Sequence, residues 1–326
     1  MAVNAIDRRA RFVGCLLGCA FGDALGAAVE MQSRSAILAR YPGLLRDFQV
    51  TARGFGRYSD DTEMSLALAK SMLRTKKVAA ADCARAYAES FTPQRGYGRS
   101  AVQVLSALQQ GADWRETGTL LFADGSYGNG AAMRIAPLGL VYGQLAAARL
   151  MTKVKAAVWM THCHREAVEA ALLQARAIGM LLQATQPPDS VAFVIQLSGY
   201  LPDTVLRVSL QLLRQLLHQR ASAEAVSDAF GCGVRSADSW PAALWAALQF
   251  SEDPEEAIIQ AVNLGGDTDT IGAMSGALVG ALHGTHWFPP RWFDNLENGA
   301  DGRDELIAVA EKLSAIPLSE SKVSAP

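Results

Sequence analysis

Residues 14–26 read GCLLGCAFGDALG and residues 272–284 read GAMSGALVGALHG, so glycine recurs at every fourth position in both stretches. A glycine inside a helix costs about 1 kcal/mol relative to alanine, so a repeated set needs a compensating gain. Residues at i and i+4 share one helix face, and each stretch therefore predicts a glycine stripe along which another backbone approaches closely. We expect the two helices to pack on each other deep in the core and to bring the two ends of the chain together. The alternative is that these glycines are merely tolerated.

The composition is that of a globular protein with a large core, since half of the 326 residues are hydrophobic and 19% are charged. The formal net charge of -2 provides no basic field for gripping nucleic acid, so no sequence-specific nucleic-acid binding is expected. The five cysteines are scattered and lack C-x-x-C spacing, which argues against a disulfide framework or a zinc knuckle. They favour a reducing compartment, and we therefore expect a cytoplasmic protein.

The N-terminal stretch RRARFVGCLLGCAFGDALGAA (8–28) has a second interpretation. A basic start, an apolar run and small residues are also typical of a secretory or lipoprotein signal. Asp23 interrupts the run, and a signal does not require glycine at every fourth residue, so both features favour a core helix. No stretch reaches the ~18 uninterrupted apolar residues that a membrane span needs, so no membrane association is expected.

Helical periodicity and good helix formers cover most of the chain. The predicted helices are 10–28, 61–74, 79–90, 99–110, 164–184, 203–219, 222–230, 240–250, 254–263, 269–283 and 303–314. The best strand-like run, SVAFVIQLSGY at 190–200, is short and isolated, so a sheet would have few strands to pair. The sequence therefore predicts an all-α fold in a single compact domain over residues 1–326, with flexible ends at 1–9 and 317–326.

Two acidic motifs stand directly before apolar helices: YSDDTEM at 58–64 and GGDTDTIG at 265–272. One interpretation is helix capping, with Asp60 and Glu63 forming a capping box and one aspartate of the second motif capping the later helix. Capping needs one side chain per helix, however, whereas each motif has two aspartates.

The other interpretation of these motifs is a divalent-cation site. Four carboxylates at one point would repel one another strongly without a cation. Together with the hydroxyls of Ser59 and Thr270 they form an all-oxygen ligand set, which suits Mg²⁺ or Mn²⁺ rather than Zn²⁺ or Cu²⁺. The spacing alone leaves capping and metal binding open.

Six motifs together resemble the ADP-ribosylglycohydrolase family. They are GCLLGCAFGDALGAAVE (14–30), YSDDTEM (58–64), GYG (96–98), GSYGNGAAMRIAPLGL (125–140), TH (161–162) and GGDTDTIGAMSGALVGALHG (265–284). They occur in the family's order and extend across most of the chain. The resemblance implies a compact domain of orthogonally packed helices with a binuclear Mg²⁺ centre, or Mn²⁺ in some members. It also implies hydrolysis of the bond between the ribose C1″ of ADP-ribose and its acceptor.

The resemblance implies roles for individual residues. The expected metal ligands are Ser59, Asp60, Asp61, Asp267, Asp269 and Thr270, with serine at position 59 where many members have threonine. Asp60 is also expected to contact the substrate. Glu30 matches a glutamate that some members carry on a mobile flap near the scissile bond. Either Glu30 or Asp269 is the expected general base for the water that attacks C1″. Asp23 is expected to support the core or the ligands.

The glycine-rich loop at 124–130 is expected to hold the diphosphate and ribose through backbone N–H groups ahead of a helix, a setting that binds phosphate without a lysine. By itself such a loop is usually only a turn. The expected substrate contacts are Gly125, Ser126, Tyr127, Gly128, Asn129, Gly130 and, in the Thr-His motif, His162. The alternation of His162, Cys163 and His164 does not favour zinc, because an oxygen shell already accounts for a metal. His164 is expected to be a local structural residue.

Two branches of the family share features with the chain. RGYG and GSYGNG resemble the branch that cleaves O-linked ADP-ribose, from serine or between units of poly(ADP-ribose), and this branch is the first choice. THCHREAVEAA resembles the arginine-specific and dinitrogenase-reductase-reactivating branches. A non-catalytic ADP-ribose-binding protein would have lost the metal carboxylates, and an unrelated two-metal phosphohydrolase would release phosphate instead. The expected partners are ADP-ribose and ADP-ribosylated proteins or peptides, bound by a monomer.

Overall fold

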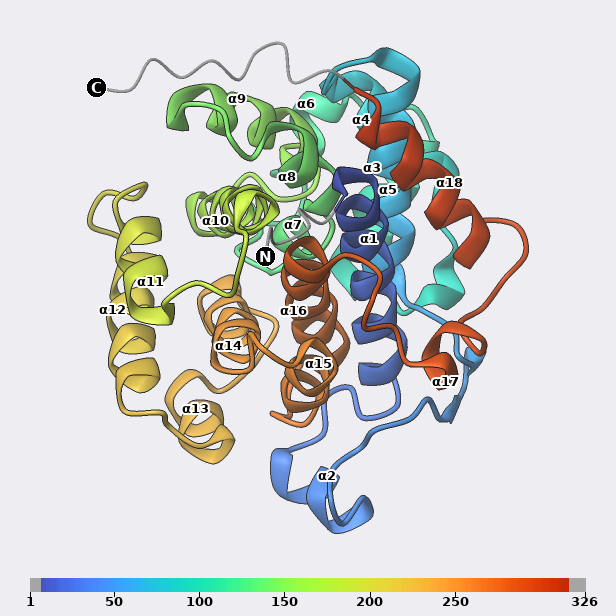
Figure 1. Ribbon diagram of the computed structural model, residues 1–326. Helices are drawn as coiled ribbons and strands as arrows, with labels where there is room; N and C mark the ends of the chain where they lie inside the picture. The colour runs from blue at the N-terminus through green and yellow to red at the C-terminus, as the bar shows by residue number, and fades with distance from the viewer. Residues whose placement is uncertain (1–6, 317–326) are drawn as a thin grey trace.

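The computed structural model describes residues 7–316, which form eighteen α-helices, one 3₁₀ turn and a two-stranded hairpin (Figure 1). The predicted all-α fold is therefore confirmed. Of the predicted flexible ends at 1–9 and 317–326, residues 1–6 and 317–326 lie outside the described residues. Arg8 and Arg9 begin the first helix, which Asp7 caps by accepting a hydrogen bond from Arg9 N.

The predicted helices all occur, with ends that differ by a few residues. The long helices are α1 (Arg8–Gly26), α3 (Asp60–Thr75), α4 (Ala80–Ser90), α5 (Arg99–Gln109), α9 (Ala147–Val158), α10 (Arg165–Gln183), α11 (Ser190–Ser198), α12 (Val205–His218), α13 (Ala223–Phe230), α14 (Ser236–Gln249), α15 (Pro254–Val262), α16 (Thr268–His283) and α18 (Arg303–Ser314). The short ones are α2 (Arg34–Arg40), α6 (Trp114–Thr117), α7 (Gly130–Met133), α8 (Ala136–Tyr142) and α17 (Pro290–Phe293). The 3₁₀ turn is Pro93–Arg95, and the strands are β1 (Val50–Thr51) and β2 (Gly54–Phe55).

The centre of the fold is the pair α1 and α16, which lie side by side (Figure 1). Their glycine stripes face each other: a Cβ built on Gly18 would collide with the carbonyl oxygen of Gly276, and one on Gly22 with that of Gly272. The two backbones touch without side chains between them, and dispersion attraction at this close approach offsets the helix-propensity cost of the glycines. The prediction that these helices pack on each other is confirmed.

The direction of this packing positions the acidic motifs. Gly26, the last residue of α1, lies against Thr268, the first residue of α16, so the end of one helix meets the start of the other. Helix α3 also packs on α1, while α10, α14 and α15 pack on α16. The first turns of α3 and α16 are thereby brought together beside the end of α1. Although α16 is buried along its length, no helix within residues 7–316 combines the length and apolarity that a bilayer span requires.

The strand-like run at 190–200 forms helix α11 and a following turn. Asp189 caps this helix by accepting a hydrogen bond from Ala192 N at 2.8 Å. Phe193, Val194 and Leu197 are buried on one face, and α11 packs on α12. Tertiary packing therefore decides the structure of a segment whose composition favours a strand. The helices α2, α6, α7, α8, α9 and α17 were not predicted either.

A small hairpin stands between α2 and α3. Val50 pairs with Phe55 and Thr51 with Gly54 in antiparallel register. The Thr51 hydroxyl accepts from Arg53 N at 3.1 Å and donates to the Gly54 carbonyl at 3.1 Å, which closes the turn. The turn thus fixes the backbone from which the Arg53 side chain extends.

Candidate active site

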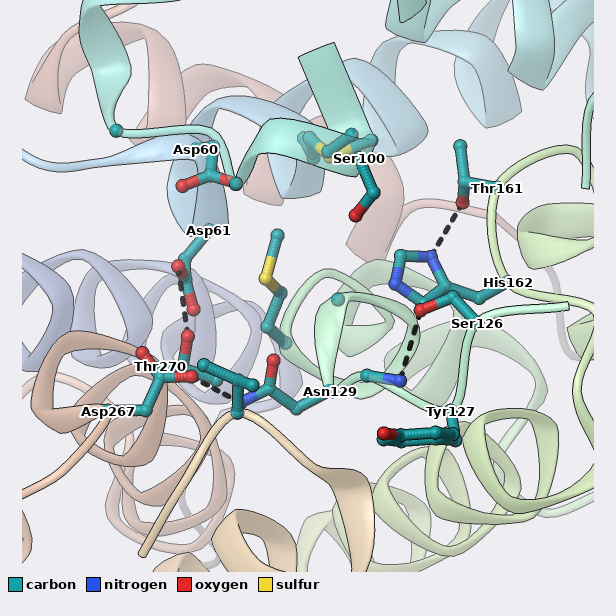
Figure 2. A pocket seen from close by; sticks show the side chains of 18 of the residues that line it. Asp60, Asp61, Ser100, Ser126, Tyr127, Asn129, Thr161, His162, Asp267 and Thr270 are labelled. Atoms are coloured by element: carbon teal, nitrogen blue, oxygen red, sulfur yellow. Dashed lines mark hydrogen bonds between the residues drawn. The ribbon is translucent and has the colours of Figure 1, made fainter. Parts of the chain in front are cut away.

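The predicted site residues meet in one cavity of about 340 Å³ (Figure 2). It is lined by every predicted site residue except Ser59, namely Glu30, Asp60, Asp61, Gly125, Ser126, Tyr127, Gly128, Asn129, Gly130, His162, Asp267, Asp269 and Thr270. In Figure 2 the labelled aspartates lie on the left, and Ser126, Tyr127 and His162 lie on the right. The cavity therefore has an acidic end and a loop end, and its size suits a small-molecule ligand.

The first turn of α3 shows which residue of YSDDTEM caps the helix. Ser59 is the capping residue, because its Oγ accepts a hydrogen bond from Asp61 N at 3.3 Å. Glu63 accepts instead from the Tyr97 hydroxyl at 2.5 Å. The predicted capping box of Asp60 and Glu63 is therefore wrong, because a hydroxyl already caps the helix. The carboxylates of Asp60 and Asp61 are therefore not needed to cap the helix.

Asp23, on α1, anchors the same helix start. Its Oδ1 accepts from Ser59 N at 2.7 Å, and its Oδ2 accepts from Thr62 N at 3.0 Å and Thr62 Oγ1 at 2.6 Å. Burial raises the pKa of Asp23, and the hydrogen bonds from Thr62 and Ser59 oppose that rise. Asp23 thus has the supporting role predicted for it, since it ties α1 to the first turn of α3.

Asp61 is the residue at which the two acidic motifs meet. Its Oδ2 accepts from the hydroxyl of Ser59 at 3.0 Å and from that of Thr270 at 3.4 Å. Its Oδ1 is buried and has no hydrogen-bond partner among residues 7–316. Burial raises the pKa of Asp61 well above its usual value, and the carboxylates of Asp23 and Asp60 raise it further. A buried carboxylate oxygen without a partner is costly, so this atom points to a ligand that the protein itself does not supply.

The start of α16 depends on two glycines. Gly265 and Gly266 have φ values of +86° and +76°, which glycine adopts without strain. A Cβ on Gly266 would also collide with the carbonyl oxygen of Cys232, so only glycine fits this tight turn. Asp267 stands at the capping position but makes no capping bond; it accepts from Asn129 Nδ2 at 2.5 Å. The interpretation of the second motif as a helix cap, by Asp267 or Asp269, therefore finds no capping bond at the N-cap position.

The carboxylates gather into two groups that share Asp269. We call Asp23, Asp61 and Asp269 the inner cluster, and Glu30, Asp267 and Asp269 the outer cluster; in each, the ligand oxygens lie within 4.8 Å of one another. The inner cluster is buried, whereas the Glu30 side chain is 32% exposed. Burial raises the pKa of Asp269 well above its usual value, and the carboxylates of Asp267 and Glu30 add to the rise. Two crowded groups of like charge are the arrangement that two cations would relieve.

The donor set fits hard divalent cations. Carboxylate and hydroxyl oxygens are the ligands that Mg²⁺ and Mn²⁺ prefer, and Asp61 offers an oxygen that no residue of the described chain satisfies. Asp60 lies outside both clusters and only lines the cavity, whereas Ser59 and Thr270 donate their hydroxyls to Asp61. Neither cluster in the described part of the chain includes a histidine or a cysteine. His164 caps α10 by accepting from a backbone N–H of its first turn, which confirms its predicted structural role.

A basic residue that the sequence did not single out reaches the outer cluster. Arg53, in the hairpin turn, places its Nη2 3.4 Å from Glu30 Oε2 and 3.9 Å from Asp269 Oδ2. Glu30 itself stands in the turn that follows α1, where Met31 N donates to the Gly266 carbonyl at 2.7 Å. The outer cluster is therefore built from two turns and one helix start.

The glycine-rich loop is bonded to its surroundings more extensively than expected. Asn129 N donates to the Val234 carbonyl at 2.9 Å, and Gly128 N donates to Ser126 Oγ at 3.2 Å. The Asn129 amide also holds Asp267, so this side chain supports the acidic end as well as lining the cavity. The helix that follows, α7, has four residues, so the helix-dipole contribution expected for phosphate binding is small. The predicted contacts of this loop with substrate stay a prediction.

His162 faces the glycine-rich loop. Its Nδ1 lies 2.9 Å from Thr161 Oγ1, which accepts from Arg134 Nη2 at 2.6 Å. A Cβ on Gly130 would lie 2.6 Å from His162 Cε1, so the ring packs directly on that glycine. Burial lowers the pKa of His162 to about 3, and the charge of Arg134 acts in the same direction. The imidazole is therefore neutral near pH 7 and acts through hydrogen bonds rather than charge.

Some cavity residues were not predicted from the sequence. They are Met64, Ser100, Ala101, Leu105, Phe122, Met133, Thr161 and Val234, together with Gly96 and Gly98 of the quoted GYG motif. Val234 is carried into the wall by a β-bridge between Gly128 and Arg235. Arg235 is in turn held by Glu166 through two bonds of 2.9 and 2.8 Å. No local pattern marks the segment around Val234, whereas the TH and GYG motifs were usable signals for Thr161 and the glycines.

Comparisons with known proteins agree with the motifs. A family model described as ADP-ribosylglycohydrolase matches residues 4–321. The ADP-ribosylhydrolase ARH3 of Mus musculus is 30% identical over 348 residues, which cover 94% of this chain and 91% of that protein. A protein of Archaeoglobus fulgidus named only as uncharacterized is 32% identical over 310 residues, covering 93% of this chain and 95% of its own.

A solved structure gives the same result for the fold. One chain of an "ADP-ribosylglycohydrolase-related protein complex" superposes with a TM-score of 0.74 at 28% sequence identity. The match covers 96% of this chain and 99% of that chain. The likeness therefore extends over the whole arrangement of helices rather than over a shared fragment.

Proposed function

The chain belongs to the ADP-ribosylglycohydrolase family and is a hydrolase, and we propose that the cavity is its active site, where the C1″ bond of an ADP-ribosylated substrate is cleaved. The observation that carries the proposal is the meeting of both acidic motifs at Asp61 within the cavity that the glycine-rich loop also lines. The acidic end would receive the reacting ribose, and the loop end the rest of the ADP-ribose unit. The product would be free ADP-ribose.

Two Mg²⁺ ions, or Mn²⁺, are the proposed cofactors. The proposed ligands are Ser59, Asp60, Asp61, Asp267, Asp269 and Thr270. The crowding of carboxylates in the two clusters supports Asp61, Asp267 and Asp269, as does Oδ1 of Asp61, which has no partner among residues 7–316. Ser59 and Thr270 donate their hydroxyls to Asp61, and Asp60 lines the same cavity. When bound, the cations supply Lewis-acid polarisation and water activation.

Glu30 is the proposed general base, with Asp269 as the alternative. Asp269 belongs to both clusters and its side chain is 5% exposed, so its oxygens are surrounded by other carboxylates. Glu30 lines the cavity, is more exposed, and has its Oε2 next to Arg53. Its Oε1 is then the atom that takes a proton from the attacking water as the bond to C1″ forms.

The loop end of the cavity is the proposed ADP-ribose-binding surface. The proposed contacts there are Gly125, Ser126, Tyr127, Gly128, Asn129, Gly130 and His162, and Asp60 is the proposed substrate contact at the acidic end. Gly130 leaves room for the imidazole of His162, which is neutral and offers Nε2 for a hydrogen bond. A neutral ring can hold a ribose hydroxyl without adding charge next to the reacting centre.

The test of the function is the substitution Asp269→Asn, which alters both clusters at once. We expect release of ADP-ribose to be abolished and Mn²⁺ binding, measured by isothermal titration calorimetry, to be lost. Asp203→Asn is the control, because that carboxylate is 96% exposed. Retained turnover in Asp269→Asn would overturn the proposal. Phosphate release instead of ADP-ribose would identify a phosphohydrolase, and binding without turnover in the wild type an ADP-ribose-binding protein.

The proposed linkage is O-linked ADP-ribose, from serine or within poly(ADP-ribose). The RGYG and GSYGNG motifs support it, and both contribute residues to the cavity. The alternative is ADP-ribosylarginine, which the segment after His162 resembles. Incubating the enzyme with matched serine- and arginine-ADP-ribosylated peptides distinguishes the two, and cleavage of the arginine adduct alone would defeat the first choice.

A single-domain, cytoplasmic monomer is the proposed state of the protein. All five cysteines are free, and four of them are buried, which supports a reducing compartment. Light scattering coupled to size-exclusion chromatography measures the oligomeric state, and a mass of two chains would contradict the monomer.

A further inference from the structure

Arg53 has an unusual position for a surface hairpin residue. Its side chain is 13% exposed, and its guanidinium lies against two of the three carboxylates of the outer cluster. Its Nη1 is 3.5 Å from the Arg95 carbonyl. Its Nε is buried without a hydrogen-bond partner among residues 7–316. The guanidinium is therefore enclosed but incompletely satisfied, which is unfavourable for a cation unless charge attraction compensates.

Two features of the backbone make room for this side chain. The Thr51 hydroxyl closes the hairpin turn and so fixes the point from which Arg53 starts. On the opposite side, a Cβ on Gly96 would collide with the Arg53 guanidinium. Gly96 also has φ +96°, which favours glycine on its own account. The guanidinium thus occupies a slot between the 95–96 backbone and the outer cluster.

The two clusters differ in how their charge is offset. In the inner cluster the donors to Asp23 and Asp61 are neutral hydroxyl and backbone N–H groups. In the outer cluster a full positive charge lies 3.4 Å from Glu30. A guanidinium and a divalent cation both seek carboxylate oxygens, and two cations at such short range repel each other.

We propose that Arg53 is a built-in counter-cation of the outer cluster, which pairs with Glu30 and Asp269 and so competes with a divalent ion for Asp269, one of the proposed ligands. The inference rests on the proposed cation site and adds a regulatory element to it. Without a divalent ion, Arg53 offsets part of the repulsion between the outer carboxylates. When the ion binds, the guanidinium leaves its slot. The hairpin that carries Arg53 lies at the surface, since Val50 and Phe55 are 79% and 49% exposed.

The experiment measures Mn²⁺ binding to the purified, metal-free protein and its variants by isothermal titration calorimetry. Arg53→Gln removes the charge, and we expect the weaker site to bind Mn²⁺ about tenfold more tightly, the order expected for loss of a unit charge a few ångströms from the ion. Arg53→Lys keeps the charge and should bind more like the wild type. Arg46→Gln is the control, because this arginine in the same inter-helix segment pairs with Glu256 instead of the cluster.

A second measurement follows from the same competition. Without metal, Arg53→Gln should unfold at a lower temperature than the wild type, because the outer carboxylates lose their counter-charge. Saturating Mg²⁺ should narrow that difference in unfolding temperature, because Arg53 is then displaced in the wild type as well.

In the wild type itself, the buried Arg53 Nε–H should exchange with solvent faster once Mg²⁺ is added. The exchange is measured by ¹⁵N NMR, with Arg53→Lys used to assign the signal. This last measurement is made on the wild-type protein, so it does not depend on whether Arg53→Gln folds.

The outcomes separate this inference from the proposed function. Unchanged or weaker Mn²⁺ binding in Arg53→Gln overturns the competition, and weaker binding would show that Arg53 supports the cation site instead. Unchanged exchange of the Arg53 Nε–H on adding Mg²⁺ overturns it as well. In each of these cases the cation site itself stands. Absence of Mn²⁺ binding in the wild type and every variant overturns both proposals.

Discussion

The inner and outer clusters share Asp269 and are nevertheless held together by different means. The inner cluster joins α1, α3 and α16 at a helix seam, and backbone N–H groups bond directly to Asp23. The outer cluster depends on side chains from turns, among them Arg53 and Asn129. A site half fixed by helices and half by turns can keep its position at one end while it adjusts to a ligand at the other. The fold should therefore tolerate changes in the outer cluster better than changes in the inner one.

The most severe way to break the inner cluster is to separate the helices that carry it. In Gly18→Val the new side chain would collide with the Gly276 carbonyl, and the backbone seam between α1 and α16 would have to open. We expect the free energy of unfolding to fall by about 4 kcal/mol, at the high end for an overpacked core. Chemical denaturation measures it. The matched control is Gly233→Val, since a Cβ there makes only a 3.5 Å contact. Equal losses in the two variants would show that the seam has no special role.

A milder change at the inner cluster removes the carboxylate of Asp23, which anchors the start of α3, and leaves the backbone contact between α1 and α16 intact. In Asp23→Asn an amide NH₂ replaces one oxygen that accepts from Ser59 or Thr62, so buried donors face each other. We expect a loss of about 2 kcal/mol of stability, the cost of an unsatisfied buried group. Mn²⁺ affinity should fall too, because Ser59 and the neighbouring aspartates lose their fixed position. Asp203→Asn, at an exposed carboxylate, should change neither quantity. Undiminished Mn²⁺ binding in Asp23→Asn would remove Asp23 from any role in the cation site.

Substitutions at the outer cluster should change stability less than those at the inner cluster. They should lower or raise Mn²⁺ affinity, depending on the residue that is changed. Asn129→Ala removes bonds of 2.5 Å to Asp267 and 3.1 Å to Ser239, and we expect a loss of about 1 kcal/mol. Mn²⁺ affinity should fall about tenfold, as is usual when a group that orients a metal ligand is removed. Asn295→Ala is the control, because this side chain is exposed and donates to the Arg291 carbonyl instead of the cluster. This change is opposite in sign to that expected for Arg53→Gln, and a shared sign would contradict the different roles given to the two residues.

How far the sequence predicts this molecule also differs between the two clusters. The seam follows from local spacing, because glycine at every fourth residue in a helix has few other uses. The pairing of the motifs at Asp61 follows from the seam, since it brings the end of α1 to the start of α16. Helix α11 could not be predicted, because its burial depends on contacts with α12.

The position of the Arg53 side chain could not be predicted from the neighbouring sequence for a similar reason. Nothing in TARGFGRYSDDT distinguishes Arg53 from Arg57, and yet Arg53 reaches Asp269 while Arg57 pairs with Glu297. The geometry of a two-residue hairpin and the space left by a distant glycine, Gly96, decide which of them turns inward. The choice of Ser59 over Asp60 as the helix cap is likewise set by Asp23, which binds Ser59 N from another helix.

Glu30→Gln is expected to cause the smallest change in stability and one of the largest changes in activity. Glu30 lies in a turn, its side chain is 32% exposed, and its contact is with Arg53 at 3.4 Å. Glu30→Gln keeps the shape of the side chain, so the free energy of unfolding should change by no more than about 0.5 kcal/mol. Loss of a general base should slow release of ADP-ribose by about 10²- to 10⁴-fold.

Single-turnover release of ADP-ribose, with binding of free ADP-ribose measured separately, separates the base from a structural residue. Because the loop proposed to bind ADP-ribose lies at the other end of the cavity from the acidic residues, Glu30→Gln should bind the product as the wild type does. Glu305→Gln, at an exposed carboxylate that pairs with Lys70, should leave both quantities unchanged. If Glu30→Gln retained wild-type turnover, the base would have to be Asp269. The catalytic proton transfer would then belong to the residue that both clusters share, and the outer cluster would lose its separate role.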